Sequence, residues 1–180
     1  MQRFDVAPWP VSLKVVSTLA TVVLLGVTFV LYRAVPRGTR APFAEEFGML
    51  VFAVPLAILL VSLLFLVRGY DLDQTGFYVD RLLWRTPIGL SGLTAAWHDP
   101  SAMKRSLRLF GNGGLFAITG IFQSKALGRY RAFVTNPKQA VVLRYETRVV
   151  VLSPADPDAL LGHLRLVSPG TVVGEPPSAV

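Results

Sequence analysis

Two long uncharged runs dominate the first 68 residues of the chain. Residues 47–67 contain twenty-one residues without a charge, and residues 15–32 contain eighteen, between Lys14 and Arg33. At about 1.5 Å per residue, helices of these lengths are roughly 31 Å and 27 Å long, close to the hydrocarbon thickness of a bilayer. The pattern therefore predicts two membrane-spanning helices. The alternatives are a buried helix of a soluble domain for the second run and a cleaved signal peptide for the first, although no small-residue cleavage motif follows it.

The segment between the two runs is short and rich in turn-forming residues. Residues 33–46 contain two prolines and a glycine, which favour a loop. Residues 1–68 are thus predicted to form a transmembrane helical hairpin with both chain ends on one side. Three arginines lie in this loop, whereas five basic residues flank the other ends of the spans. Because basic residues concentrate on the cytoplasmic side, we expect a multi-pass protein of the cell (inner or plasma) membrane, with cytoplasmic N- and C-termini and lipid around both spans.

After residue 68 the pattern changes from continuous apolar runs to alternation over short segments. Turn-forming clusters separate these segments, among them the Gly-Asn-Gly-Gly run at 111–114, which we interpret as a tight hairpin turn. Many short alternating segments with regularly spaced turns are typical of a small barrel or sandwich. We therefore predict about seven short strands.

The last element before the tail has a helical pattern. Asp156 can cap a helix, Pro157 suits its first turn, and the leucines at 160, 161 and 164 fall on one face. We expect this helix to close the strand-rich domain, which we place at residues 69–168. The tail at 169–180 is rich in proline, glycine and serine, and we expect it to be disordered.

Composition and charge narrow the function classes. The chain has a net charge of +7 and no cysteine, which excludes disulfides, thiolate zinc sites and cysteine nucleophiles. Beyond residue 68, twelve basic residues stand against eight acidic ones. This balance suits an anionic membrane surface. No dense basic run and no nucleic-acid-binding motif is present, so we expect no nucleic-acid partner.

Residues capable of catalysis or metal binding are sparse and poorly grouped. His98, Asp99 and Ser101 are close in sequence, but sequence neighbours seldom reach the geometry of a catalytic triad, and we interpret them as a turn. The two histidines lack acidic partners at metal-ligand spacing. We therefore expect no catalytic, cofactor-binding or metal-binding residues, no cofactor, and no enzymatic activity.

Basic residues of the strand region form the candidate binding surface. Arg129 and Arg131 are two residues apart and share one face of a predicted strand, and Arg105 and Arg108 precede the glycine-rich run. These four arginines are candidates for contact with an acidic protein partner or with anionic lipid. The alternative is a solvated wall of the barrel. Any lipid affinity of this surface is expected to be electrostatic and without headgroup preference.

Three segments resemble a known family. They are SLRLFGNGGLF at 106–116, LGRYRAFVTNPKQAVVL at 127–143 and SPADPDALLGHLR at 153–165. Together with the two preceding spans, they are similar to bacterial PH domains that follow a membrane hairpin. The resemblance implies an all-β, PH-like seven-stranded barrel capped by a C-terminal α-helix. It implies no activity, because PH-like folds carry binding modules of many kinds.

The function predicted from these observations is a non-enzymatic, membrane-anchored PH-like interaction module. It is expected to bind a protein partner or to form a homo-oligomer at the membrane face. The alternative is an accessory subunit of a transport or envelope complex, which would contact that complex through the transmembrane hairpin.

Overall fold

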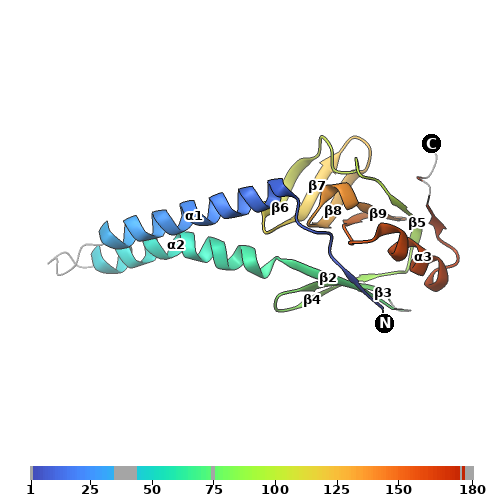
Figure 1. Cartoon of the computed structure of the whole chain (residues 1–180), viewed down its shortest axis with the longest axis horizontal. Helices are drawn as coiled ribbons and strands as arrows, with labels where there is room; N and C mark the ends of the chain where they lie inside the picture. Colours follow the sequence, from blue (N-terminus) through green and yellow to red (C-terminus); the bar gives the residue numbers. More distant parts are fainter. Residues whose placement is uncertain (1, 35–43, 74–75, 175, 177–180) are drawn as a thin grey trace.

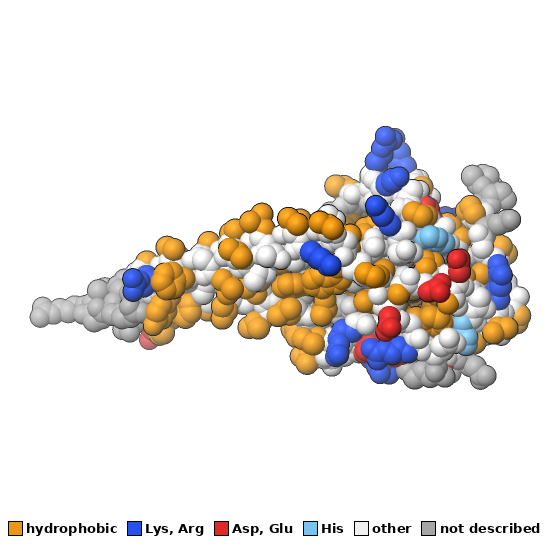
Figure 2. All heavy atoms as spheres, in the orientation of Figure 1, with side chains coloured by type: hydrophobic (Ala, Val, Ile, Leu, Met, Phe, Trp, Pro, Cys, Tyr) orange, Lys and Arg blue, Asp and Glu red, His pale blue; other side chains and the backbone are white. Residues whose placement is uncertain are grey.

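Two long antiparallel helices project from a compact β-rich region (Figure 1). The computed structural model describes residues 2–34, 44–73, 76–174 and 176. Helices α1 (Val11–Ala34) and α2 (Ala44–Leu64) pack along each other, and both are long and apolar enough to cross a membrane. Hydrophobic side chains cover the visible face of this hairpin, while charged side chains lie at its two ends and on the β region (Figure 2). Most of the predicted loop lies outside the described residues.

The first sheet has four antiparallel strands in the order β1-β2-β3-β4. Strands β2 (Val67–Leu72), β3 (Gly76–Arg81) and β4 (Arg85–Gly89) follow α2 directly along the chain. Strand β1 (Gln2–Asp5) comes from before α1 and pairs with β2, with Phe4 opposite Tyr70. The sequence analysis assigned no element to these residues. The N-terminus is therefore part of the β domain.

The second sheet has seven strands in the order β11-β5-β9-β10-β8-β7-β6. Its β10–β8 and β11–β5 pairs are parallel, and the others are antiparallel. The strands are β5 (Leu93–His98), β6 (Leu107–Leu115), β7 (Ala117–Ser124), β8 (Gly128–Val134), β9 (Val141–Tyr145), β10 (Val149–Leu152) and β11 (Val172–Val173), with a short 3-10 helix η1 (Pro137–Gln139) between β8 and β9.

The predicted closed seven-stranded barrel is wrong in one respect. The seven-stranded sheet has two ends, β6 and β11, and β1–β4 form a separate sheet. Closure would need another strand beside β6, but the start of α1 packs against β6 instead. The PH-like β region is thus made of two sheets that face each other across a shared core.

That core is closed by helix α3 (Pro157–Val167), as predicted from its leucines. Asp156 caps the helix by accepting a hydrogen bond from the Ala159 amide at 2.9 Å. Leu160, Leu161 and Leu164 are buried in the cluster that also contains side chains of both sheets. The helix lies on the side of the β region opposite the far tip of the hairpin (Figure 1).

Two local expectations differ from the structure. The run 111–114 lies within β6 and is not the hairpin turn; the chain reverses at Phe116, whose φ is 67°. The described part of the tail is not disordered, because β11 pairs with β5 and the Gly174 amide donates to the Ala96 carbonyl at 2.8 Å. Residues 175 and 177–180 of the predicted tail lie outside the described residues.

Polar contacts fix the start of the chain to the domain. The Ala7 amide donates to the Ser153 carbonyl at 2.8 Å, and the Thr135 hydroxyl donates to the Ala7 carbonyl at 2.8 Å. Ser17, in the second turn of α1, bridges the β6–β7 turn: its hydroxyl donates to the Gly114 carbonyl at 3.2 Å and accepts from the Phe116 amide at 3.0 Å. The domain end of the hairpin is therefore held against β6.

Candidate functional site

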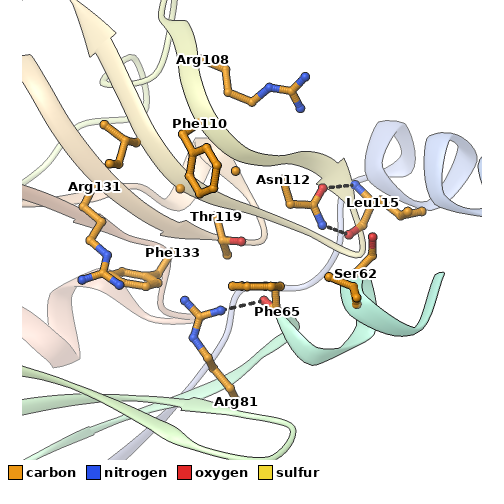
Figure 3. Close-up of a pocket in the computed structure, with 14 residues that line it drawn as sticks. Ser62, Phe65, Arg81, Arg108, Phe110, Asn112, Leu115, Thr119, Arg131 and Phe133 are labelled. Atoms are coloured by element: carbon orange, nitrogen blue, oxygen red, sulfur yellow. Dashed lines mark hydrogen bonds between the residues drawn. The ribbon is translucent and has the colours of Figure 1, made fainter. Parts of the chain in front are cut away.

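A groove of about 560 Å³ lies where α2 ends and the seven-stranded sheet begins (Figure 3). We call it the junction groove. Its walls come from the last turn of α2, the residues just after it, and strands β3, β6, β7 and β8. Its lining residues are Val61, Ser62, Phe65, Arg81, Arg108, Phe110, Gly111, Asn112, Leu115, Thr119, Gly120, Ile121, Arg131 and Phe133. The volume is within the range of small-molecule pockets.

Two of the residues that line the groove are glycines on adjacent strands. Gly111 on β6 and Gly120 on β7 are directly opposite each other, with φ of 109° and 144°. A Cβ on Gly111 would lie 2.3 Å from the Thr119 carbonyl oxygen, and one on Gly120 would lie 2.1 Å from the Phe110 carbonyl oxygen. Only glycine fits at both positions. The absence of a Cβ at both positions allows β6 and β7 to approach each other closely at this point of the groove lining.

Two arginines flank one aromatic ring inside the groove. The guanidinium carbons of Arg81 and Arg131 lie 5.1 Å and 4.8 Å from the ring centroid of Phe133. Both side chains point toward that ring, whereas Arg108 extends from β6 at the rim (Figure 3). Such cation–π contacts are modestly favourable. They do not neutralise charge, so two positive groups remain close together.

Arg81 is the most unusual of these groups because it is a buried cation. Its residue is 5% exposed, and it donates hydrogen bonds to the Thr86 hydroxyl at 3.1 Å and to the Phe65 carbonyl at 3.3 Å. Both acceptors are neutral. Burial, with a further contribution from the nearby charge of Arg131, lowers the pKa of Arg81 to about 10. Buried charges are ordinarily paired, and among the described residues no carboxylate pairs with Arg81.

The nearest acidic residues of the first sheet are engaged elsewhere. Asp71 lies 3.5 Å from Arg85, and Asp80 lies 3.6 Å from Arg85 and 3.4 Å from Arg3. None of these residues lines the junction groove. Among the residues that the structure describes, the groove is therefore lined by three arginines and by no acidic side chain.

The groove also contains an unsatisfied hydroxyl. Thr119 on β7 is 2% exposed, and its Oγ1 has no hydrogen-bond partner among the described residues. Buried polar groups are normally bonded. Next to the end of α2 the groove has the apolar side chains of Val61, Phe65 and Leu115, together with the polar residues Ser62 and Asn112.

The four arginines predicted from the sequence differ in which cavity, if any, they line. Arg108 and Arg131 line the junction groove, and Arg129 and Arg131 line a second cavity of about 310 Å³. Arg105 has a φ of 55°, stands in the turn before β6, and lines neither cavity. Neither cavity is lined by all four residues.

Arg81 is not among the site residues predicted from the sequence. Phe77, Val79 and Arg81 alternate along β3, and all three are buried. Alternate residues of a strand face the same side. A basic residue that continues a series of alternate core residues is therefore the sequence signal that could have identified Arg81.

The outer edge of β6 is a second exposed feature. Leu107 is 67% exposed and Phe110 is 76% exposed, and Leu109 is also exposed. β6 ends the seven-stranded sheet, so only one of its sides pairs with a strand. Edge strands with apolar side chains are prone to pair with other chains.

The cluster at His98 is a turn, as predicted. The Asp99 carboxylate accepts hydrogen bonds from both the amide and the hydroxyl of Ser101 at 2.7 Å. Nε2 of His98 lies 3.3 Å from the Lys138 carbonyl oxygen. Among the described residues, no three His, Cys, Asp or Glu side chains are grouped to hold a metal ion.

Comparison with known proteins gives one match. A family model described as a bacterial PH domain matches residues 68–167, which correspond to β2 through α3. The searches of curated proteins and of solved structures find no match.

Proposed function

Because the chain belongs to the bacterial PH domain family, we propose that it is a membrane-anchored, non-enzymatic interaction module. Its hairpin spans the membrane, and its domain pairs with a strand of another protein at the membrane face. PH-like domains are binding modules more often than catalysts. The hairpin returns both of its ends to the domain (Figure 1), which supports placing the N- and C-termini on one side of the membrane. That this side is cytoplasmic rests on the distribution of basic residues.

The observation that carries this proposal is the exposed edge of β6 at residues 107–110, away from Gly114, where Ser17 of α1 is bonded. The strand is nine residues long, ends its sheet, and exposes Leu107, Leu109 and Phe110. An extended segment can add to such an edge through main-chain hydrogen bonds, with side-chain contacts that give specificity. The start of α1 packs against β6, so an added strand would lie next to the membrane.

Photo-crosslinking in cells tests this pairing. A photoreactive residue at Leu107 should give an adduct, while one at Val172 should not, because Val172 is also exposed but lies on β11, the opposite edge of the same sheet. An adduct of twice the chain mass identifies a second copy, and any other mass identifies a different protein. Leu109→Lys should abolish the adduct, and Leu83→Lys, at an exposed position outside β6, should leave it. Equal adducts from Leu107 and Val172 would contradict the proposal.

The alternative role, an accessory subunit that contacts a transport or envelope complex through its hairpin, stays a prediction. It would require adducts from photoreactive residues on α1 or α2 and none from β6.

A further inference from the structure

We infer that the junction groove binds an anionic phospholipid, with the headgroup phosphate between Arg81 and Arg131 and an acyl chain along the end of α2. This inference rests on the proposed membrane anchoring. It is independent of strand pairing at β6. It also differs from the non-specific surface attraction expected from the sequence.

The first argument is charge. Arg81, Arg108 and Arg131 line one groove that has no acidic lining residue. Arg81 and Arg131 flank the same Phe133 ring, and their mutual repulsion together with burial lowers the pKa of Arg81. An anion bound between them would remove the repulsion and provide the counter-charge that the described chain lacks. Arginine binds phosphate oxygens especially well, because its fork of N–H groups matches their geometry.

The second argument is the buried hydroxyl. Thr119 Oγ1 is buried and unpartnered in the wall of this groove. Figure 3 shows its side chain between Phe110 above and Phe65 and Arg81 below. A bound phosphate would accept a hydrogen bond from this hydroxyl. Arg81 lacks a counter-charge among the described residues, and Thr119 lacks a hydrogen-bond partner. The two observations are independent and concern the same groove.

The third argument separates a lipid from a free phosphate. Val61, Phe65 and Leu115 give the groove an apolar wall, and Val61 belongs to the last turn of the membrane helix α2. A soluble phosphate gains nothing from such a wall, whereas an acyl chain does, at about 0.8 kcal/mol for each buried CH₂. The groove also opens at the end of the second span, where the lipid headgroups lie. Position and lining therefore favour a phospholipid over a soluble anion or an acidic protein segment.

Lipid titration of the full chain in detergent, followed by native mass spectrometry, tests the inference. The probes are phosphatidylglycerol, phosphatidylcholine with identical acyl chains, and inorganic phosphate. The wild-type chain should bind phosphatidylglycerol at least roughly tenfold more tightly than phosphatidylcholine. Arg131→Gln should weaken phosphatidylglycerol binding by roughly tenfold to hundredfold, because it removes a charge-assisted hydrogen bond.

Two further variants make the result specific. Arg129→Gln removes the same charge from another exposed residue of β8 that does not line the groove, and it should leave the affinity unchanged. Thr119→Val should weaken phosphatidylglycerol binding severalfold without lowering the thermal stability, since it removes only an unpaired hydroxyl. Arg81→Gln is expected to behave as Arg131→Gln does; if it fails to fold, Arg131→Gln decides alone.

Several results would overturn the inference. Equal losses for Arg129→Gln and Arg131→Gln would mean general surface attraction. Equal affinity for phosphatidylglycerol and phosphatidylcholine would mean that the headgroup charge is not recognised. Displacement of the lipid by inorganic phosphate at a similar concentration would mean that the acyl chain contributes nothing. None of these results would alter the crosslinks expected at Leu107, so failure here is distinguishable from failure of the proposed function.

Discussion

Replacement of Phe4 by alanine tests whether the N-terminal strand is an integral part of the domain. Phe4 is 7% exposed, belongs to the core cluster shared by both sheets and α3, and its ring centroid lies 5.9 Å from that of His163. Truncation of a buried phenylalanine typically costs about 3–5 kcal/mol. Because β1 is an edge strand of only four residues, which can relax around the missing ring, we expect the lower value, about 3 kcal/mol.

This loss should be easy to measure. A domain of this size has a total stability of about 5–15 kcal/mol. With a urea dependence of about 2 kcal/mol per molar, the unfolding midpoint should fall by about 1.5 M. The assay is urea unfolding of the full chain in lipid nanodiscs, followed by tryptophan fluorescence, because Trp97 is buried in the seven-stranded sheet.

The matched control is Gln2→Ala, at an exposed position of the same strand. Its midpoint should equal that of the wild-type chain. An unchanged midpoint for Phe4→Ala would refute the reasoning, since it would mean that β1 adds nothing to the core. An equal drop for both variants would mean that the effect does not come from burial.

Two further predictions concern the same core. Leu161→Asp should prevent stable folding, because it places a charge on the buried face of α3; Leu166→Asp, at an exposed position of that helix, should be tolerated in the same urea assay. Burial raises the pKa of Tyr70 to about 12, above its ordinary value of about 10. The folded state therefore disfavours the phenolate, and its stability should be fully present below about pH 10 and decline as the pH rises toward about 12; a flat urea midpoint across this range would contradict the assignment.

The elements that the sequence predicted well are those with local signals. The two long apolar helices follow from uninterrupted apolar runs, and α3 follows from its cap at Asp156 and its leucine spacing. Each of these patterns is complete within about 20 residues, so it needs no knowledge of distant partners.

The elements that were missed depend on pairing between distant segments. The strand at β1 has only four residues, and what orders it is β2, more than 60 residues further along the chain. The glycine run at 111–114 carries the composition of a turn. Gly111 is instead required by its close approach to Gly120 on the next strand. Composition alone cannot separate these two uses of glycine.

Only part of the candidate site was predicted, because the rest of it also depends on contacts between distant segments. Arg108 and Arg131 were identified as exposed basic residues, and both line the groove. Arg81 was missed because burial of an arginine is rare, and an isolated charge at the end of a strand is usually solvated. The groove itself depends on the position of the end of α2 beside strands of the seven-stranded sheet. No pattern within either segment indicates that position.

In the proposed membrane-anchored protein, the connections between hairpin and domain would determine how deep the groove lies relative to the bilayer. Only Phe65 and Leu66 separate the end of α2 from the start of β2. On α1, Ser17 is hydrogen-bonded to the β6–β7 turn. Ala7, which precedes α1, is hydrogen-bonded to Thr135 and Ser153. With both helices fixed in this way, the domain cannot tilt or rise far from the bilayer without breaking buried hydrogen bonds. Arg81 and Thr119 are thereby held close to the last turn of α2. If the hairpin spans the membrane as proposed, this arrangement would hold the buried cation of Arg81 near the headgroup layer, whereas a domain on a flexible tether would first need to find its lipid.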